Sequence, residues 1–260
     1  MVDQNPLLWV CWMELVFEDA TLFKRYVDGI SALVDEAEFL IDENGLSLKA
    51  TDPSQISLID FNLPKKAFKH FNISGPTKIG VDLNYFNQVI SRAKSGDSLS
   101  ISIGEDSSKL SLGFSGNSKR TFLIPLLDLT IADLPLPKIE FDSQVAIRAD
   151  ALSESFKDAS LVSTHIVLSV ENDSFVVRAN SSKGNLNNVY SSKDKSVISL
   201  KANDETRAMF PLDYLTSIIK ATASDTEVLV KLKSNAPVEI SYKIGEGKFD
   251  FFLAPRIETE

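Results

Sequence analysis

Residue types that commonly carry catalysis or bind metals are sparse in this chain. Its 260 residues include one cysteine, Cys11, and two histidines, His70 and His165, which lie far apart. A zinc site of the usual kind needs four closely spaced Cys or His ligands, so we expect no metal site and no cofactor. A single cysteine also excludes an internal disulfide and is typical of a reducing intracellular compartment.

Two glycine-containing segments resemble catalytic motifs but occur in the wrong context. Residues 245–248 (Gly-Glu-Gly-Lys) lie between two predicted strands, whereas a phosphate-binding loop joins a strand to a helix. Residues 113–116 are one residue short of a nucleophile elbow and also precede a strand. The 36 Asp and Glu residues are spread throughout, so no pair is singled out as general acid and base. We therefore predict no catalytic activity.

The elements that would position a site occur in two similar sets. Apolar residues recur at a displacement of 129 positions, with Leu83, Tyr85, Phe86, Val89 and Ile90 matching Leu212, Tyr214, Leu215, Ile218 and Ile219. The same displacement pairs residues 99–103 with 228–232 and residues 119–124 with 248–253. A register held over this length indicates two similar domains in tandem, over residues 13–126 and 142–260. A duplicated chain without a catalytic motif favours a scaffold or an assembly over an enzyme.

Hydrophobic periodicity predicts an α+β fold, each domain consisting of a strand-helix-three-strand unit written twice. Spacings of three and four predict helices over residues 22–34, 84–94, 151–159 and 212–222. Alternation predicts strands over 15–17, 37–41, 46–48, 56–61, 79–83, 99–103, 110–114 and 120–125 in the first domain, and over 166–170, 175–179, 186–191, 228–232, 238–244 and 249–254 in the second. We expect the helices on one face of the sheets and strands alone on the other.

Two segments lie outside the repeat. Residues 127–141 form a predicted connector whose prolines, Pro135 and Pro137, disfavour a helix and weaken strand pairing. It is apolar and not rich in Gly or Ser, so we expect it to lie pinned along a surface. Residues 1–12 are interpreted as an N-terminal extension. Their apolar run over 7–12 lacks a basic leader and is shorter than the roughly 20 residues of a membrane span, so we expect neither a signal peptide nor an anchor.

The overall charge limits how the chain can contact nucleic acid. The formal net charge is −9, while 43% of the residues are hydrophobic, enough for two globular domains with cores of their own. Tight nucleic-acid binding is driven mainly by neutralisation of phosphates. The negative net charge therefore argues against a protein that binds nucleic acid over its whole surface.

Four segments carry a family-specific sequence. Residues 128–137 read Asp-Leu-Thr-Ile-Ala-Asp-Leu-Pro-Leu-Pro, and residues 253–258 read Leu-Ala-Pro-Arg-Ile-Glu. Residues 50–58 and the helix start at 212–215 support them. Over residues 13–258 the chain resembles the sliding clamps of DNA replication, of the proliferating-cell-nuclear-antigen type of archaea and eukaryotes. The first two segments are similar to that family's interdomain connecting loop and C-terminal signature.

The resemblance implies a ring of three two-domain subunits with helices lining the hole and sheets outside. Edge strands of neighbouring subunits would pair across each joint, which also protects exposed strand edges. The interface residues implied by the resemblance are Leu110, Leu112 and Phe114 on one subunit and Leu186, Val189 and Ser191 on the next. Whether the ring is a homotrimer or a heterotrimer is left open by the sequence.

The resemblance also implies that double-stranded DNA is held by encirclement, with weak sequence-independent contacts. The candidate DNA-facing residues are Lys24, Arg25, Arg92, Lys94, Lys157 and Lys220. The alternative is that these are ordinary solvated helix charges. Gln88, Ser91 and Glu154 stand where the family often has cations, so the lining is thin, which makes a heterotrimer a plausible hypothesis.

A pocket for client proteins is the other site that the resemblance implies. Clients of such clamps carry a short segment with a glutamine, an aliphatic residue and two aromatics, which plugs a hydrophobic pocket. Carried over to this chain, the pocket consists of Gln55, Ile56, Leu134, Leu136, Pro237, Phe252, Ala254, Pro255 and Ile257. For Ile56 and Phe252, ordinary core packing is the alternative.

The sequence therefore predicts a non-enzymatic subunit of a sliding clamp, a processivity factor for DNA polymerase. The implied partners are double-stranded DNA, other clamp subunits, a clamp loader, DNA polymerase, flap endonuclease and DNA ligase, with no membrane contact. The expected localisation is cytoplasmic and nucleoid-associated, or nuclear in a eukaryote. The alternatives are a soluble two-domain enzyme with an unrecognised site, or a clamp-like interaction scaffold without a DNA role.

Overall fold

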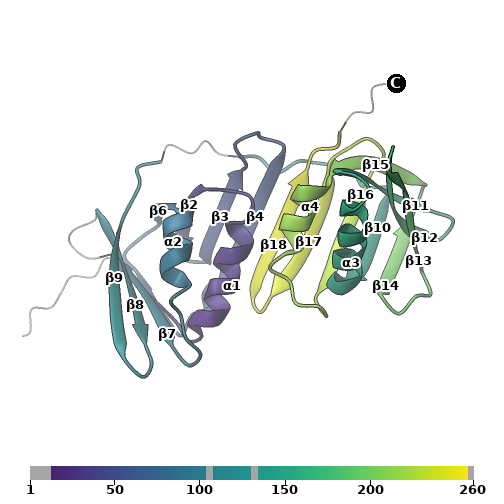
Figure 1. The fold of residues 1–260 in the computed structure, drawn as a ribbon. Helices are drawn as coiled ribbons and strands as arrows, with labels where there is room; N and C mark the ends of the chain where they lie inside the picture. Colours follow the sequence, from purple (N-terminus) through teal and green to yellow (C-terminus); the bar gives the residue numbers. More distant parts are fainter. Residues whose placement is uncertain (1–12, 104–107, 130–133, 257–260) are drawn as a thin grey trace, which may run out of the picture.

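The computed structural model describes residues 13–103, 108–129 and 134–256. The predicted N-terminal extension, part of the connector and Ile257 lie outside the described residues. The first domain runs from β1 to β9 and the second from β10 to β18, with two α-helices in each (Figure 1).

The elements of the first domain follow the predicted order closely. They are β1 (Met13–Phe17), α1 (Ala20–Ile30), β2 (Glu36–Asp42), β3 (Gly45–Thr51), β4 (Ser57–Pro64), the short 3-10 helix Lys65–Ala67, β5 (His70–Ile73), β6 (Thr77–Asp82), α2 (Leu83–Ile90), β7 (Ser98–Ile103), β8 (Lys109–Ser115) and β9 (Lys119–Pro125). The α-helices begin at side-chain caps, since Asp19 accepts hydrogen bonds from the backbone amides of Thr21 and Leu22, and Asp82 from that of Tyr85. These hydrogen bonds, with that of the Thr21 hydroxyl first, hold the pKa of Asp19 below its usual value.

The second domain repeats the same plan. Its elements are β10 (Ser143–Arg148), α3 (Ala149–Ser160), β11 (His165–Glu171), β12 (Ser174–Ser181), β13 (Gly184–Ser191), β14 (Val197–Ala202), β15 (Thr206–Pro211), α4 (Leu212–Ile219), β16 (Glu227–Leu232), β17 (Val238–Ile244) and β18 (Gly247–Leu253). Four strands were not among those expected from the sequence. β5 is an additional strand of the first domain and β14 is its counterpart in the second. β10 and β15 of the second domain were also not predicted. β5 does alternate, with His70 and Asn72 on the exposed face, but its four residues are too few for the pattern to be recognised.

Three antiparallel sheets form the outer layer. The first domain has a five-stranded sheet of order β5-β1-β7-β8-β9, and the second a four-stranded sheet of order β13-β12-β11-β15. Between them a nine-stranded sheet of order β14-β10-β16-β17-β18-β4-β3-β2-β6 spans both domains. The β4–β18 pairing, from Ser57 opposite Leu253 to Asn62 opposite Lys248, joins the domains, and we call this pairing the interdomain seam.

All four helices cover the same side of this curved layer (Figure 1). α1 packs on α2 and α3 packs on α4, as expected from the apolar stripe of each helix. The predicted arrangement, with helices on one face and strands alone on the other, is confirmed by the structure.

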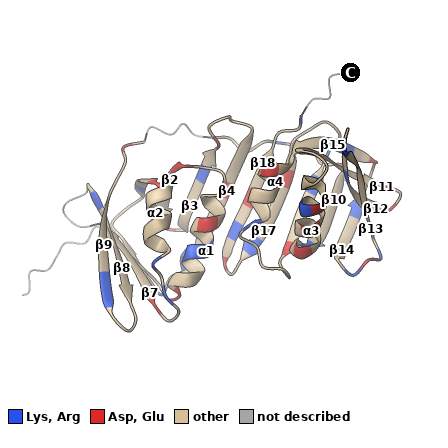
Figure 2. Cartoon of the chain, in the orientation of Figure 1, with Lys and Arg blue, Asp and Glu red and all other residues tan. Residues whose placement is uncertain are grey.

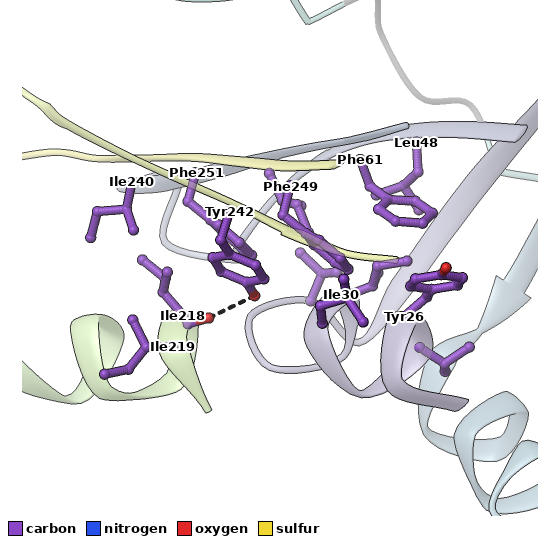
Figure 3. Packing of buried hydrophobic residues seen from close by; sticks show 14 of the residues in the cluster. Tyr26, Ile30, Leu48, Phe61, Ile218, Ile219, Ile240, Tyr242, Phe249 and Phe251 are labelled. Carbon is purple, nitrogen blue, oxygen red and sulfur yellow. Dashed lines mark hydrogen bonds between the residues drawn. The ribbon is translucent and has the colours of Figure 1, made fainter. Parts of the chain in front are cut away.

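The hydrophobic core is continuous across the interdomain seam. The rings of Phe61 and Phe249 lie 4.7 Å apart between centroids, and Tyr242 stacks on Phe249 at 5.0 Å. Figure 3 shows these rings between the sheet and the helices, with the Tyr242 hydroxyl donating a hydrogen bond of 2.8 Å to the carbonyl of Ile218 on α4. A β-carbon added at Gly29 would lie 2.9 Å from the Phe249 ring, so glycine lets α1 approach the seam closely. The two domains therefore share one core.

Among the described residues, no helix is both long and apolar enough to cross a membrane.

Candidate functional site

The ends of β4, β17 and β18 bring three of the predicted pocket residues together. Beyond the last seam pair, the Ala254 amide donates a 2.8 Å hydrogen bond to the Ile56 carbonyl. Pro237 immediately precedes Val238, which lies opposite Leu253 in the β17–β18 pairing. Ile56, Pro237 and Ala254 are each partly exposed. The register of the strands thus gathers these apolar residues, distant in sequence, at one end of the seam.

Phe252 lies on the outer face of the sheet and not in the shared core. Phe251 and Leu253 on either side of it belong to the core, and successive residues of a strand point to opposite faces. Only 7% of Phe252 is exposed, although it lies on the face away from the helices. Phe252 is thus buried apart from the core that the helices cover, and its place in the pocket stays a prediction.

The loop that presents Gln55 is built on one carboxylate that the sequence interpretation missed. Asp52 is 3% exposed, and its side chain accepts hydrogen bonds from the amides of Ser54, Ile56 and Ser57 at 2.7–2.9 Å. Gln55 has a φ of 57°, in the left-handed region, and its side chain is exposed. The Asp-Pro-Ser sequence that begins the loop is typical of a turn in which Asp binds the backbone after it, a signal that could have identified Asp52.

The C-terminal segment after β18 is tied to the second domain. The Arg256 amide donates a 2.8 Å hydrogen bond to the Met209 carbonyl on β15, and its guanidinium lies 3.1 Å from a ring nitrogen of His165. Burial, and then the nearby Arg256 charge, lower the pKa of His165. Pro255, between Ala254 and Arg256, is partly buried. The segment is thereby held beside the cluster of Ile56, Pro237 and Ala254.

The connector is anchored at its first residues. The Leu127 amide donates a 2.9 Å hydrogen bond to the Gly80 carbonyl on β6, one of the two edge strands of the nine-stranded sheet. A β-carbon at Gly80 would lie 2.2 Å from the Leu127 carbonyl oxygen, so the connector sits directly on this strand. Leu134 and Leu136 are partly buried. Within the described part of the chain, no strand pairing links these two leucines to the cluster at the end of the seam.

The predicted DNA-facing cations lie on or just after the helices, but carboxylates accompany them. Lys24 pairs with Asp28 on α1, and Lys157 pairs with Glu154 on α3 at 2.7 Å. Figure 2 shows basic and acidic segments together on both helices. Arg25 donates a long hydrogen bond of 3.5 Å to the Ala221 carbonyl after α4. The remaining three, Arg92, Lys94 and Lys220, are exposed.

A groove of about 500 Å³ runs between α3 and α4. Lys157 and Lys220 line it together with Asp150 and Glu154, and hydroxyl residues such as Thr216 and Ser217 complete its wall. The groove therefore presents donors for phosphate oxygens but little net positive charge, in agreement with the thin lining expected from the sequence.

The strand topology corrects one predicted half of the subunit interface. Leu110, Leu112 and Phe114 lie in β8, which pairs with β7 on one side and β9 on the other. They are at most 2% exposed, so β8 has no free edge to offer another subunit. The edge strands of this sheet are β5 and β9, and on β9 Leu123 is 61% exposed. Strand order depends on long-range pairing, which periodicity cannot reveal.

The other predicted half, β13, does lie at a free edge. Val189 is 53% exposed there, while Leu186 and Ser191 are partly buried. The edge strands β9 and β13 belong to different domains and to the two outermost sheets, at opposite ends of the molecule (Figure 1). One chain thus carries one exposed edge strand in its first domain, β9, and one in its second, β13.

No group of three or more His, Cys, Asp or Glu side chains that could hold a metal ion occurs among the residues that the structure describes. His70 lies 3.8 Å from Glu14 at the surface, and His165 contacts Arg256, so the two histidines belong to separate surroundings.

Comparison with known proteins gives matches over both domains. The family model for the N-terminal domain of proliferating cell nuclear antigen matches residues 12–138, and the model for its C-terminal domain matches residues 135–257. A DNA polymerase sliding clamp from Thermococcus gammatolerans is 35% identical over 94% of this chain and 98% of the relative. The sliding clamp of Pyrococcus furiosus is 32% identical with the same coverage.

Solved structures show the same likeness. The fold matches proliferating cell nuclear antigen from Thermococcus kodakaraensis with a TM-score of 0.90 and 26% identity, over 94% of this chain and 100% of the other. It also matches that of A. fulgidus, solved with the C-terminal region of FEN-1 bound, with a TM-score of 0.85 and 26% identity, over 95% and 100% of the two chains.

Proposed function

Because the chain belongs to the proliferating cell nuclear antigen family, we propose how its own residues perform the work of a DNA sliding clamp. The protein is a DNA polymerase processivity factor and not an enzyme. It forms a ring with other clamp subunits around double-stranded DNA and recruits replication and repair proteins, flap endonuclease among them. We further infer that a clamp loader, DNA polymerase and DNA ligase use the same platform, inside the cell and at the nucleoid.

The client pocket is assigned to the end of the interdomain seam. The convergence of Ile56, Pro237 and Ala254 beside the outward-facing Phe252 carries this proposal. Partly exposed apolar side chains gathered from both domains favour a partner segment that buries them. Leu134, Leu136 and Pro255 complete the pocket in the proposal, with Gln55 at its rim. Ile257 is included on the family resemblance alone.

The interdomain seam also serves as a template for the joint between subunits. β18 corresponds to β9 by the displacement of 129 positions, so Phe251 corresponds to Phe122. In the β3–β4 hairpin, Ala50 lies opposite Ile59. In the corresponding β12–β13 hairpin, its counterpart Ala179 lies opposite Leu186.

Phe251 and Ile59 face each other in the seam. We therefore propose that β9 pairs antiparallel with β13 of the next subunit, with Phe122 opposite the next subunit's Leu186. Val189 and Ser191 keep their proposed interface role, whereas β9 replaces β8.

The DNA-facing role is proposed for the exposed Arg92, Lys94 and Lys220, for the carboxylate-paired Lys24 and Lys157, and for Arg25. Since carboxylates already neutralise part of this charge, phosphate contacts are weak and lost easily in salt. Weak contacts suit a ring that must slide, because encirclement keeps the DNA inside it.

Peptide binding tests the pocket. We expect a synthetic client peptide, with glutamine, an aliphatic residue and two aromatics, to bind near the micromolar level by calorimetry, about −8 kcal/mol. Leu136→Ala should weaken binding about tenfold, because a leucine side chain that a partner buries contributes about 1.5–3 kcal/mol over an exposed one. Leu129→Ala is the matched control, since Leu129 packs near Gly80 at the anchored end of the connector. Equal weakening by both variants, or no binding by the unaltered chain, would contradict the assignment.

A further inference from the structure

A hydrogen bond crosses the domain boundary directly beside the proposed pocket. The Tyr214 hydroxyl, in the first turn of α4, donates to a carboxylate oxygen of Asp52 at 2.9 Å. Asp52 belongs to the first domain and precedes β4, while Tyr214 belongs to the second. Together they form a link between the pocket loop of one domain and a helix of the other, which we call the Asp52–Tyr214 link.

Asp52 determines the shape of the loop that carries Gln55. One carboxylate oxygen accepts the amides of Ile56 at 2.9 Å and Ser57 at 2.7 Å. The other accepts the Ser54 amide and the Tyr214 hydroxyl, both at 2.9 Å. The Gln55 amide donates to the Asp52 carbonyl at 2.9 Å. Because the three loop amides and the Tyr214 hydroxyl all bind one carboxylate, a group that fixes the orientation of this carboxylate also fixes the conformation of the loop.

The duplication provides an internal comparison. The counterpart of Tyr214 in the first domain is Tyr85, at the same place in α2. Tyr85 is 44% exposed, whereas Tyr214 is partly buried. The counterpart of Asp52 is Ser181, whose hydroxyl donates to the Val162 carbonyl within its own domain. The link is therefore a feature of the seam next to the pocket and not a requirement of the helix.

We propose that Tyr214 is a positioning residue for client binding: through Asp52 it holds the loop of Gln55 and Ile56 in the conformation that receives the peptide. The inference rests on the proposed function of the pocket. Tyr214 itself is not required to touch the peptide. Its effect reaches the client through Asp52 and the amides of Ile56 and Ser57.

The hydroxyl is not needed to hold the domains together. The seam has six opposed residue pairs in β4–β18 and the contact of Phe61 with Phe249. Removing one hydroxyl at its end leaves these contacts in place, so the consequence is local to the loop. Asp52 would keep its three amide donors but lose the only donor from the second domain, one of two that bind the same oxygen.

The test compares Tyr214→Phe with Tyr85→Phe in the full chain. Each variant loses one hydroxyl at corresponding positions of the two domains. Amide hydrogen exchange of residues 52–57 reports the loop without any ligand, and calorimetry with the synthetic client peptide reports the pocket. For Tyr214→Phe we expect exchange at Ile56 and Ser57 to be about fivefold faster and peptide affinity about fivefold weaker, equivalent to about 1 kcal/mol. Tyr85→Phe should change neither by more than about twofold.

The two readouts separate the inference from the function on which it rests. Unchanged exchange in Tyr214→Phe would overturn the link, and faster exchange with unaltered peptide affinity would overturn the positioning role. Equal changes in exchange and affinity for Tyr214→Phe and Tyr85→Phe would also overturn the positioning role, since a general loss of stability would then be the cause. If the unaltered chain bound no peptide, the proposed pocket would fail, and its positioning residue with it.

Discussion

Two buried tyrosines show how a single hydroxyl contributes to this core. Tyr242 is 3% exposed, and its hydroxyl satisfies the Ile218 carbonyl, linking β17 to α4. Burial raises the pKa of Tyr242, so it stays protonated and donates this hydrogen bond at all physiological pH values. Tyr26 is 1% exposed, and its hydroxyl lies near the backbone amides of Glu246 and Gly247 but makes no hydrogen bond of good geometry within the described residues. Both rings lie in the cluster of Figure 3.

This difference predicts unequal costs for the same substitution. Tyr242→Phe leaves the Ile218 carbonyl without its donor, so we expect the free energy of unfolding to fall by about 1–2 kcal/mol. Tyr26→Phe, the matched control, removes a hydroxyl that makes no hydrogen bond of good geometry and should change stability by less than about 0.5 kcal/mol. Urea unfolding of both variants measures the difference. Equal losses, or a larger loss in Tyr26→Phe, would contradict the proposed role of the Tyr242 hydroxyl.

At the scale of elements, local patterns were predictable and long-range pairing was not. The helices were predicted to within a few residues because their apolar stripes and flanking turns are local signals. The choice of β8 over β9 as the edge was wrong because sheet order depends on which distant strands meet. The Asp52–Tyr214 link was missed for the same reason, as it joins residues 162 positions apart. The residues of the proposed pocket come from the family resemblance and stay a prediction, and the Asp52 carboxylate that shapes the Gln55 loop was not predicted.

The connector offers a prediction about an element as a whole. Gly80→Ala would place a β-carbon 2.2 Å from the Leu127 carbonyl oxygen, so the start of the connector must move away from β6. We expect a loss of about 1–3 kcal/mol in the free energy of unfolding and faster proteolysis within residues 127–141. Gly75→Ala is the control, because a β-carbon there meets nothing within 4 Å. A Gly80→Ala protein with unaltered stability and connector cleavage would show that β6 does not anchor the connector.

At the scale of the whole molecule, the ring depends on whether the joint copies the seam. Phe252 faces Leu58 in the seam. By the displacement of 129 positions, the counterpart of Phe252 is Leu123 on β9. Leu58 lies opposite Thr51, whose counterpart Asn180 lies opposite Asn185, so the counterpart of Leu58 is Asn185 on β13. Opposed residues of antiparallel strands have Cα atoms about 4.5–5.5 Å apart, within the range that a disulfide spans. Because this chain carries both edges, we predict that three copies close a ring without another kind of subunit.

A cysteine pair tests this register and the ring together. In a Cys11→Ser background, Leu123→Cys with Asn185→Cys should oxidise to a product of three times the chain mass of 28.7 kDa in a denaturing gel. The control, Leu123→Cys with Asn187→Cys, places the second thiol on the same face but two residues out of register, and should cross-link much less. Equal cross-linking of both pairs would contradict the register. A chain that remains monomeric by native mass would contradict a homotrimer and favour a heterotrimer.

The covalently closed ring then separates encirclement from ordinary DNA binding. Rings loaded onto a circular plasmid by a clamp loader and then oxidised should remain on the DNA at about 1 M salt, where phosphate contacts are screened within about 3 Å. They should leave when the plasmid is cut once, because only topology holds them. Reduced rings should leave the intact circle through opened joints more readily than oxidised ones. Salt-sensitive binding that does not depend on circularity would instead indicate an interaction scaffold without a clamp role, since the paired helix cations alone cannot hold DNA against that salt.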